Sequence, residues 1–185
     1  MSTLDLLVAL VAVTLGAGGG LTYARVHRTR QARGAGSVRR ILLPFTGTAI
    51  SRRSLDAAFR LARAENATLV PAFLATVPRH LPLDAAVPAA CSVGMPLLEA
   101  IEQAAARAEV PVDARVARGR TYRHALERLL EEEPVDRVIV SATGNPRNGL
   151  TDDDMVWLLQ RAPAEVLILR PDFEDHGKLT GATVG

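Results

Sequence analysis

The chain has 185 residues, enough for one globular domain with short additional segments, and 48% of them are apolar. Its one cysteine, Cys91, excludes an internal disulfide, and its four histidines are too scattered for a zinc site, so we expect no bound metal. The abundance of alanine and arginine suggests a bacterial source.

The net charge of +2 conceals an uneven distribution of charge. Six arginines and no acidic residue lie between residues 25 and 40, and acidic residues outnumber basic ones in the rest of the chain. The high isoelectric point therefore belongs to one short segment. This distribution argues against an extended basic surface, so we expect no nucleic-acid partner.

Residues 6–24 contain no charged side chain. A helix of this length, at about 1.5 Å per residue, roughly spans the hydrocarbon layer of a bilayer, so we expect residues 1–25 to form a transmembrane helix. A secretory signal peptide would begin with positive charge, whereas this chain begins with MSTLD. A buried helix of a soluble domain is a further alternative, which the length of the segment and its lack of a polar face disfavour.

Arginines follow the predicted span directly, and the cytoplasmic flanks of membrane helices are rich in such residues. We therefore expect Arg25, Arg28 and Arg30 to flank the inner face of the plasma membrane, with the N-terminus outside. The same arginines could bind anionic lipid headgroups, but a flank that stops translocation, followed by a linker, explains them as their primary role. The protein is thus predicted to be a single-pass protein of the inner membrane, with residues 26–38 as a basic linker and a cytoplasmic domain beyond.

The predicted span also carries a stripe of small residues. Ala12, Gly16 and Gly20 recur at a spacing of four, which places them on one side of a helix. Small residues in such a stripe allow a second membrane helix to approach closely. The pattern also arises by chance in spans that are rich in alanine and glycine, so both interpretations remain open.

Residues 39–171 alternate between short apolar runs and amphipathic stretches. The apolar runs predict strands over residues 40–45, 68–74, 110–117, 136–142 and 165–169. The amphipathic stretches predict helices over residues 51–65, 95–108, 121–133 and 151–161. This alternation indicates an α/β fold with a doubly wound, five-stranded parallel sheet of the Rossmann-like kind.

Three segments depart from this regular alternation. Pro71 lies inside the second predicted strand, which predicts a bulge or a weakly paired position. Residues 75–94 are rich in proline and are predicted to form a long irregular loop that contains Cys91, with Pro96 in the first turn of the next helix. Residues 172–185 are predicted to be a flexible tail.

In parallel α/β sheets, ligands bind beyond the carboxyl ends of the strands. The first strand ends in the turn Thr46-Gly47-Thr48, which makes Thr46 and Gly47 candidate ligand-binding residues. The third strand ends at Gly119-Arg120, and an arginine at such a position could hold an anion. In the alternative interpretation, these residues form only a turn, and Thr121 caps the helix that follows.

Four stretches together carry a family resemblance: ILLPFTGT at residues 41–48, GRTYRHALERL at 119–129, DRVIVSATG at 136–144 and RAPAEVLILRP at 161–171. Their order and spacing resemble the universal stress protein family over residues 39–171. The resemblance implies a small α/β domain that takes part in stress responses, with an ATP-binding and a non-binding branch of the family. It also adds Gly144, in the loop after the fourth strand, to the candidate ligand-binding residues.

The chain departs from the pattern of the ATP-binding branch at both of its motifs. Binders carry an acidic residue in the first strand–helix turn, where this chain has Thr46. Binders also carry a loop of the form G-x2-G-x9-G-[ST], but here Arg147 stands three residues after Gly144, and Asp152 and Asp153 replace the final pair. Because these carboxylates would repel phosphate, we expect no ATP binding of the usual kind and no cofactor.

The acidic run at residues 152–154 has two further interpretations. Thr151 followed by three aspartates is typical of a strong N-terminal helix cap. The three carboxylates could instead hold a cation, although no further ligands are visible in the sequence. Arg147 could likewise hold an anion, or it could be a solvated charge in a loop.

No catalytic arrangement can be recognised, so we expect no enzyme: His124 has no nucleophile that the sequence places beside it. The resemblance implies instead an accessory or regulatory module, anchored in the membrane and associated with a transporter or another membrane protein complex. The alternative is a sensor of a nucleotide or another small anion. Family dimers pair through the closing strand, which here is Glu165–Leu169 and implies a possible homodimer.

Overall fold

The computed structural model describes residues 39–85, 88–142, 150–170 and 178–180, all of which belong to a unit that covers Val38–Gly185. Within these ranges no helix combines the length and apolarity needed to cross a membrane. The predicted span at residues 6–24 lies outside them, so the anchor stays a prediction. The same holds for its small residues and its basic flank, namely Ala12, Gly16, Gly20, Arg25, Arg28 and Arg30.

The centre of the domain is a five-stranded sheet in which every pair of neighbours is parallel. The strand order is β4-β3-β1-β5-β6. The bounds are β1 Arg40–Phe45, β3 Thr68–Thr76, β4 Arg115–Gly119, β5 Arg137–Ser141 and β6 Glu165–Leu169. The predicted five-stranded parallel sheet is therefore confirmed.

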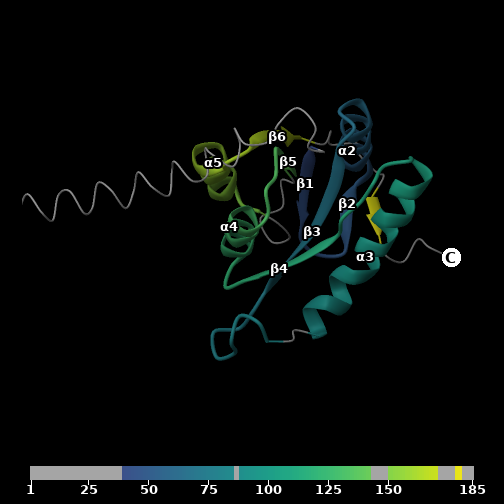
Figure 1. Ribbon diagram of the computed structural model, residues 1–185. Coiled ribbons are helices and arrows are strands. Elements are labelled where there is room, and N and C mark those ends of the chain that lie inside the picture. The colour runs from purple at the N-terminus through teal and green to yellow at the C-terminus, as the bar shows by residue number, and fades with distance from the viewer. Residues whose placement is uncertain (1–38, 86–87, 143–149, 171–177, 181–185) are drawn as a thin grey trace, which may run out of the picture. The chain divides into compact units, whose positions relative to one another are not determined.

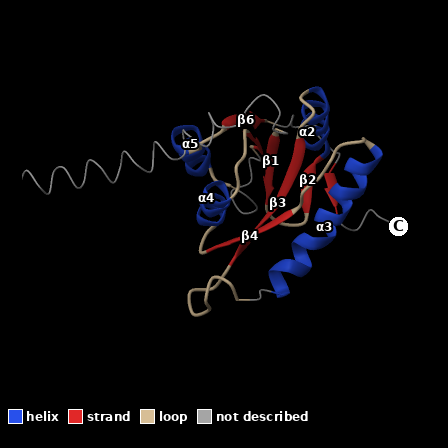
Figure 2. Ribbon diagram, in the orientation of Figure 1, coloured by secondary structure: helices blue, strands red, loops and turns tan. Residues whose placement is uncertain are grey.

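Helices cover both faces of the sheet (Figures 1 and 2). The helices are α2 Arg52–Ala64, α3 Pro88–Arg107, α4 Tyr122–Glu132 and α5 Asp152–Arg161. Buried residues of α2 and α3 belong to one core cluster, and those of α4 and α5 belong to a second. The sheet separates the two clusters, so the fold is doubly wound, as the alternation of elements predicts.

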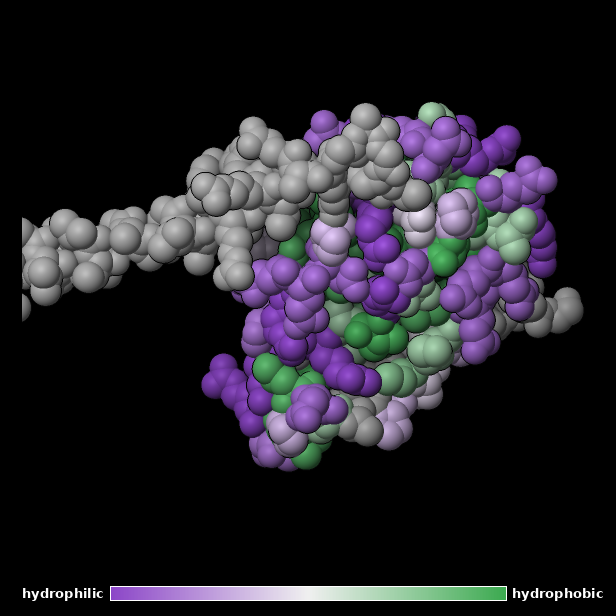
Figure 3. Space-filling model, in the orientation of Figure 1, coloured by the Kyte–Doolittle hydropathy of each residue, from purple (hydrophilic) through white to green (hydrophobic). Residues whose placement is uncertain are grey.

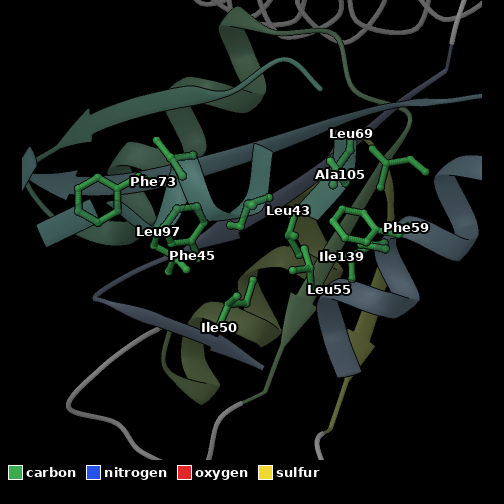
Figure 4. Packing of buried hydrophobic residues seen from close by; sticks show 14 of the residues in the cluster. Leu43, Phe45, Ile50, Leu55, Phe59, Leu69, Phe73, Leu97, Ala105 and Ile139 are labelled. Carbon is green, nitrogen blue, oxygen red and sulfur yellow. The ribbon is translucent and has the colours of Figure 1, made fainter. Parts of the chain in front are cut away.

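β1 lies at the middle of the sheet, and its side chains pack into both core clusters. Ile41 and Leu43 point to the cluster under α2 and α3, whereas Leu42 points to the cluster under α4 and α5. All three side chains are at most 1% exposed, because helices cover both faces of the strand. At the carboxyl end, the rings of Phe45 and Phe73 pack with their centroids 5.7 Å apart (Figure 4).

Pro71 forms no bulge on the β1 side, where it pairs in register with Leu43. On the other side, the Leu69 amide donates to the Pro111 carbonyl, and the alternate residue along the strand is Pro71. Proline has no amide hydrogen, so the next bond toward β4 is missing. Regular pairing resumes only at Ala72 with Arg115, which explains why β4 begins five residues later than predicted.

α3 begins at Pro88, seven residues before the predicted start, and Pro96 lies inside the helix rather than in its first turn. Proline suits the first turn of a helix, and the proline in that position is Pro88 rather than Pro96, so the predicted start is wrong. Cys91 is therefore a half-buried helix residue against the core, not a residue of an exposed loop. Gly94 lets α3 approach closely, because a Cβ there would lie 2.4 Å from the Phe73 ring.

A second, two-stranded sheet joins two distant parts of the chain. β2 Ala49–Ser51 pairs antiparallel with β7 Lys178–Thr180, with Ile50 opposite Leu179. Residues 178–180 fall inside the predicted flexible tail, and for them that prediction is wrong. Strands of three residues are too short to show an alternating pattern in the sequence.

Ion pairs join neighbouring strands at the amino edge of the sheet. Arg137, at the start of β5, bridges Glu65 and Glu165, and Arg39 donates to Glu65 at 3.1 Å. Burial raises the pKa of Glu65, but the hydrogen bonds from Arg137 and Arg39 together lower it by more than burial raises it, so the net shift is downward. This edge is occupied by structural ion pairs, which leaves the opposite, carboxyl edge for a ligand.

Candidate functional site

The carboxyl edge of the sheet contains a topological switch point. From β1 the chain continues to β3 on one side, and it returns later to β5 on the other side of β1. Ligands of open α/β sheets bind at such a point, here between the carboxyl ends of β1 and β5. Thr46 and Gly47 follow β1 at this point, whereas Gly119 and Arg120 lie at the end of β4, with β3 in between.

The turn after β1 is built around Gly47. Its φ of +72° lies in the left-handed region, which glycine adopts without strain, and a Cβ at this position would contact nothing within 4 Å. The preceding residue, Thr46, is only 8% exposed. After the turn, Ser51 caps α2 by accepting a hydrogen bond from the Ser54 amide at 3.4 Å. The turn thus presents backbone and a buried hydroxyl, with no carboxylate.

Gly119 is required by packing. A Cβ at this position would lie 2.2 Å from the amide nitrogen of Ala125 and 2.7 Å from its Cα. Both atoms belong to the backbone of α4, so they cannot move aside as the end of a flexible side chain could. Gly119 therefore allows α4 to pack directly against the end of β4, which accounts for the glycine without a ligand.

The guanidinium of Arg120 is used within the fold. Its Nη1 donates to the carbonyl oxygens of Val77 (3.3 Å) and Pro78, in the loop after β3. Its backbone amide donates to Nδ1 of His124 at 3.2 Å, and Thr121 caps α4 by accepting from the His124 amide at 3.1 Å. The prediction that Thr121 caps the helix is confirmed. Arg120 donates to the loop after β3 with the group that would otherwise donate to an anion.

α5 begins with a closed capping box. The Asp154 carboxylate accepts from the backbone amide of Thr151 at 2.8 Å and from its hydroxyl at 2.9 Å. The Thr151 hydroxyl in turn accepts from the Asp154 amide at 3.3 Å. The predicted helix cap is therefore confirmed.

Arg123 of α4 completes the environment of Asp154. Its Nε donates to the carboxylate at 2.7 Å, and its guanidinium lies over the Trp157 ring at 5.9 Å from the centroid. Burial raises the pKa of Asp154, but the hydrogen bonds from Thr151 and Arg123 together lower it by more than burial raises it, so the net shift is downward. Asp154 is thus ionised at neutral pH.

The first turn of α5 consequently repels anions. Asp152 and Asp153 are exposed beside the ionised Asp154. A phosphate charge about 5 Å from one such carboxylate would face roughly 3 kcal/mol of repulsion at an effective dielectric constant near 20. The described residues contain no cluster of His, Cys, Asp or Glu that could hold a metal. Gly144 and Arg147 lie outside the described part of the chain.

Ser141 belongs to the site and was missed by the sequence analysis. It ends β5 at the switch point, and its Oγ is buried without a hydrogen-bond partner within the described structure. A buried hydroxyl usually has a partner, so an unpaired one at this position is a ready donor for a ligand. Its sequence signal was slight: one serine that ends the apolar run VIV.

Comparisons with known proteins agree with this fold. The universal stress protein family matches residues 37–170, most of the chain, so the chain belongs to this family. No curated protein matches it. A solved universal stress protein family member from Burkholderia pseudomallei is 22% identical, with a TM-score of 0.55, over 74% of this chain and 98% of that one.

Two other solved structures show the same likeness. The universal stress protein UspA from Lactobacillus plantarum is 16% identical over 73% of this chain and 99% of that one, with a TM-score of 0.54. A universal stress protein in complex with cAMP is 20% identical over 71% of this chain and 96% of that one, with a TM-score of 0.55. At these identities the likeness concerns the fold.

Proposed function

We propose that this protein is a membrane-anchored universal stress protein that acts without catalysis, as an accessory or regulatory module on the cytoplasmic face of the inner membrane. It would work beside a transporter or another membrane protein complex. The anchor rests on the uncharged residues 6–24 and their basic flank. The absence of the usual ATP binding rests on the start of α5.

The capping box of α5 is the observation that supports the proposed absence of ATP binding. A helix N-terminus binds phosphate through free amide hydrogens and a positive dipole end. In this chain, Asp154 and Thr151 close the cap, and the exposed Asp152 and Asp153 add negative charge. These features disfavour phosphate binding at the start of α5.

Calorimetric titration of residues 38–185 with ATP tests whether the domain binds this nucleotide. The domain can be studied alone, because solved relatives consist almost entirely of it, with 98% and 99% of their chains covered. We expect no micromolar binding, with or without Mg²⁺. The double variant Asp152→Gly, Asp153→Ser restores the glycine–hydroxyl pair of the family loop, and any latent site should then gain affinity.

The control for that variant removes the same charge elsewhere: Glu99→Ser with Glu102→Ser, two exposed positions on α3. A gain of ATP affinity in the α5 variant alone would support electrostatic exclusion at this helix. Micromolar binding by the unmodified domain would contradict the proposal and favour a tethered nucleotide sensor.

A sensor of a nucleotide or another small anion is the second candidate function. The observation that favours it is the buried, unpaired Oγ of Ser141 at the switch point. Solved relatives are described with cAMP and with AMP bound. If a ligand uses this hydroxyl, Ser141→Ala should abolish the thermal shift that cAMP or AMP produces. No shift with either nucleotide in the unmodified domain would exclude both as ligands.

The partner is tested in native membranes. After gentle solubilisation, the full chain should co-purify with a membrane protein, and a chain that lacks residues 1–37 should lose it. Recovery of the full chain with nothing but itself would contradict the accessory role.

Self-association through β6 is a separate proposal. β6 is an edge strand of the sheet, and Ile168 is 36% exposed there. Leu159, on α5, is 63% exposed. Unpaired edges invite pairing with another strand, and a lysine on the edge discourages it. We expect Ile168→Lys to shift a dimer toward monomer by about tenfold or more in analytical ultracentrifugation, whereas Val93→Lys on α3 should leave it unchanged.

A further inference from the structure

The outer face of α2 carries a stripe of arginines. Arg52, Arg53, Arg60 and Arg63 are all exposed, and at 3.6 residues per turn they fall within about 100° of the helix circumference. The opposite side of α2 is buried in the core, so the stripe is held outward by the packing of the helix. Asp56 is the one acidic residue among them. We call these four residues the arginine face.

The other helices differ from α2 in charge. α3 carries two glutamates and one arginine, and α4 carries three glutamates and two arginines. α5 carries three aspartates and one arginine. The positive charge of the folded domain is therefore concentrated on α2, which lies on one side of the sheet (Figure 1). Hydrophilic side chains, with some apolar ones among them, lie on the domain surface in that region (Figure 3).

Three of the four arginines on this face, Arg52, Arg60 and Arg63, take no part in ion pairs among the described residues, whereas Arg53 has an interaction within the chain. By contrast, Arg40 and Arg115 are each engaged by two carboxylates at the amino edge of the sheet. Exposed guanidinium groups without internal partners are free to meet an external anion.

The arginine face lies beside the point where the linker enters the domain. Arg39 donates to Glu65 at 3.1 Å, and Glu65 is the C-cap residue of α2. The carbonyl of Arg39 also accepts from the Thr68 amide at 2.7 Å, just after that helix. The described part of the domain therefore begins beside the C-terminal end of α2, and the basic segment that starts at Arg25 precedes this point in the sequence.

We propose that the arginine face of α2 docks the domain onto an anionic phospholipid surface. This inference rests on the proposed function, because the predicted anchor brings the domain to the membrane. At full extension residues 26–38 would reach roughly 45 Å, so a tethered domain stays near the bilayer and can turn α2 toward it. Each basic residue near an anionic bilayer adds to the attraction, so Arg52, Arg60 and Arg63 together are enough to bias the orientation of a tethered domain.

Docking gives the domain a defined side toward the membrane. α4 and α5 lie on the face of the sheet opposite α2, so they point away from the lipid. The acidic start of α5 is then turned from the anionic surface, which would repel it. A partner protein would thus meet α4, α5 and the adjoining edge β6, while α2 holds the domain in place.

Vesicle sedimentation of residues 38–185 tests the docking without the anchor. The vesicles are phosphatidylcholine, alone or with about 30% phosphatidylglycerol, in about 0.1 M salt. We expect binding to the anionic vesicles only. The triple variant Arg52→Gln, Arg60→Gln, Arg63→Gln should lower the partition coefficient by at least about tenfold.

A matched control removes three exposed arginines from other parts of the surface: Arg79→Gln, Arg107→Gln and Arg161→Gln. The two triple variants have the same net charge, so a loss confined to the α2 variant supports docking through this face. An equal loss in both would overturn the proposal in favour of unspecific attraction, and so would an absence of binding to anionic vesicles. Tighter, α2-dependent binding to a short RNA or DNA duplex would overturn it in favour of nucleic acid.

The anchor is tested separately by alkaline carbonate extraction of the full chain from native membranes. A full chain that stays in the membrane, combined with no vesicle binding by residues 38–185, would contradict only the docking. A full chain that is extracted would contradict the anchor, whatever the vesicles show.

Discussion

Replacing Gly119 with alanine is expected to destabilise the domain by at least about 3 kcal/mol. The new Cβ would lie 2.2 Å from the Ala125 amide nitrogen and 2.8 Å from the carbonyl carbon of His124. Both are backbone atoms, so relief requires α4 to move away from the core that Leu126 and Leu129 help to form. Urea unfolding followed by circular dichroism measures the loss of stability.

Gly47→Ala is the control for that prediction. A Cβ there meets no atom within 4 Å, so only the left-handed backbone conformation resists the substitution, at a cost of about 1 kcal/mol. A similar, small cost at both glycines would contradict the close packing of α4 on β4. The stability of the Gly119 variant also has to be known before a loss of ligand binding in it is interpreted, because an unfolded domain would lose binding as well.

Asp154→Ala is expected to cost about 2–3 kcal/mol. The substitution removes acceptors for the amide and hydroxyl of Thr151, and it removes the partner of Arg123. The side chain of Asp154 is only 12% exposed, so water replaces these bonds poorly. The control is Asp153→Ala, an exposed position in the same turn, which should change the stability by a few tenths of a kcal/mol.

The same carboxylate predicts how stability depends on pH. The pKa of Asp154 is lower in the folded protein than its ordinary value, so folding favours the ionised form. Its contribution is complete above the ordinary pKa of an unfolded aspartate, near 4, and is lost as the pH falls through the lower pKa of the folded state. Asp154→Ala should therefore flatten the acid limb of the stability curve below about pH 5. An unchanged acid limb would show that Asp154 is not the group that titrates.

The results for the candidate site separate two kinds of residue. Gly119 and Arg120, which a ligand-based interpretation would favour, are both explained by packing and by a fastened loop. Ser141, which no motif indicated, is the described residue that keeps an unsatisfied buried hydroxyl at the switch point. Experiments on ligand binding should therefore begin with Ser141 and the start of α5.

The sequence by itself determined the order and number of the main strands. Runs such as Ile41-Leu42-Leu43 and Val138-Ile139-Val140 are apolar throughout because both faces of a parallel sheet are covered, and this demand is visible in a few adjacent residues. The cap of α5 was predictable for the same reason, since Thr151 and Asp154 lie within one turn of each other.

Only the tertiary structure decided which distant residues meet. Arg120 finds its acceptors 43 and 42 residues away, and β2 pairs with a segment near the other end of the chain. The arginine face depends likewise on the side of α2 that the core buries, and on Arg39 reaching Glu65. Local periodicity reports whether a residue is inside or outside, but a partner far along the chain is selected by packing of the whole domain.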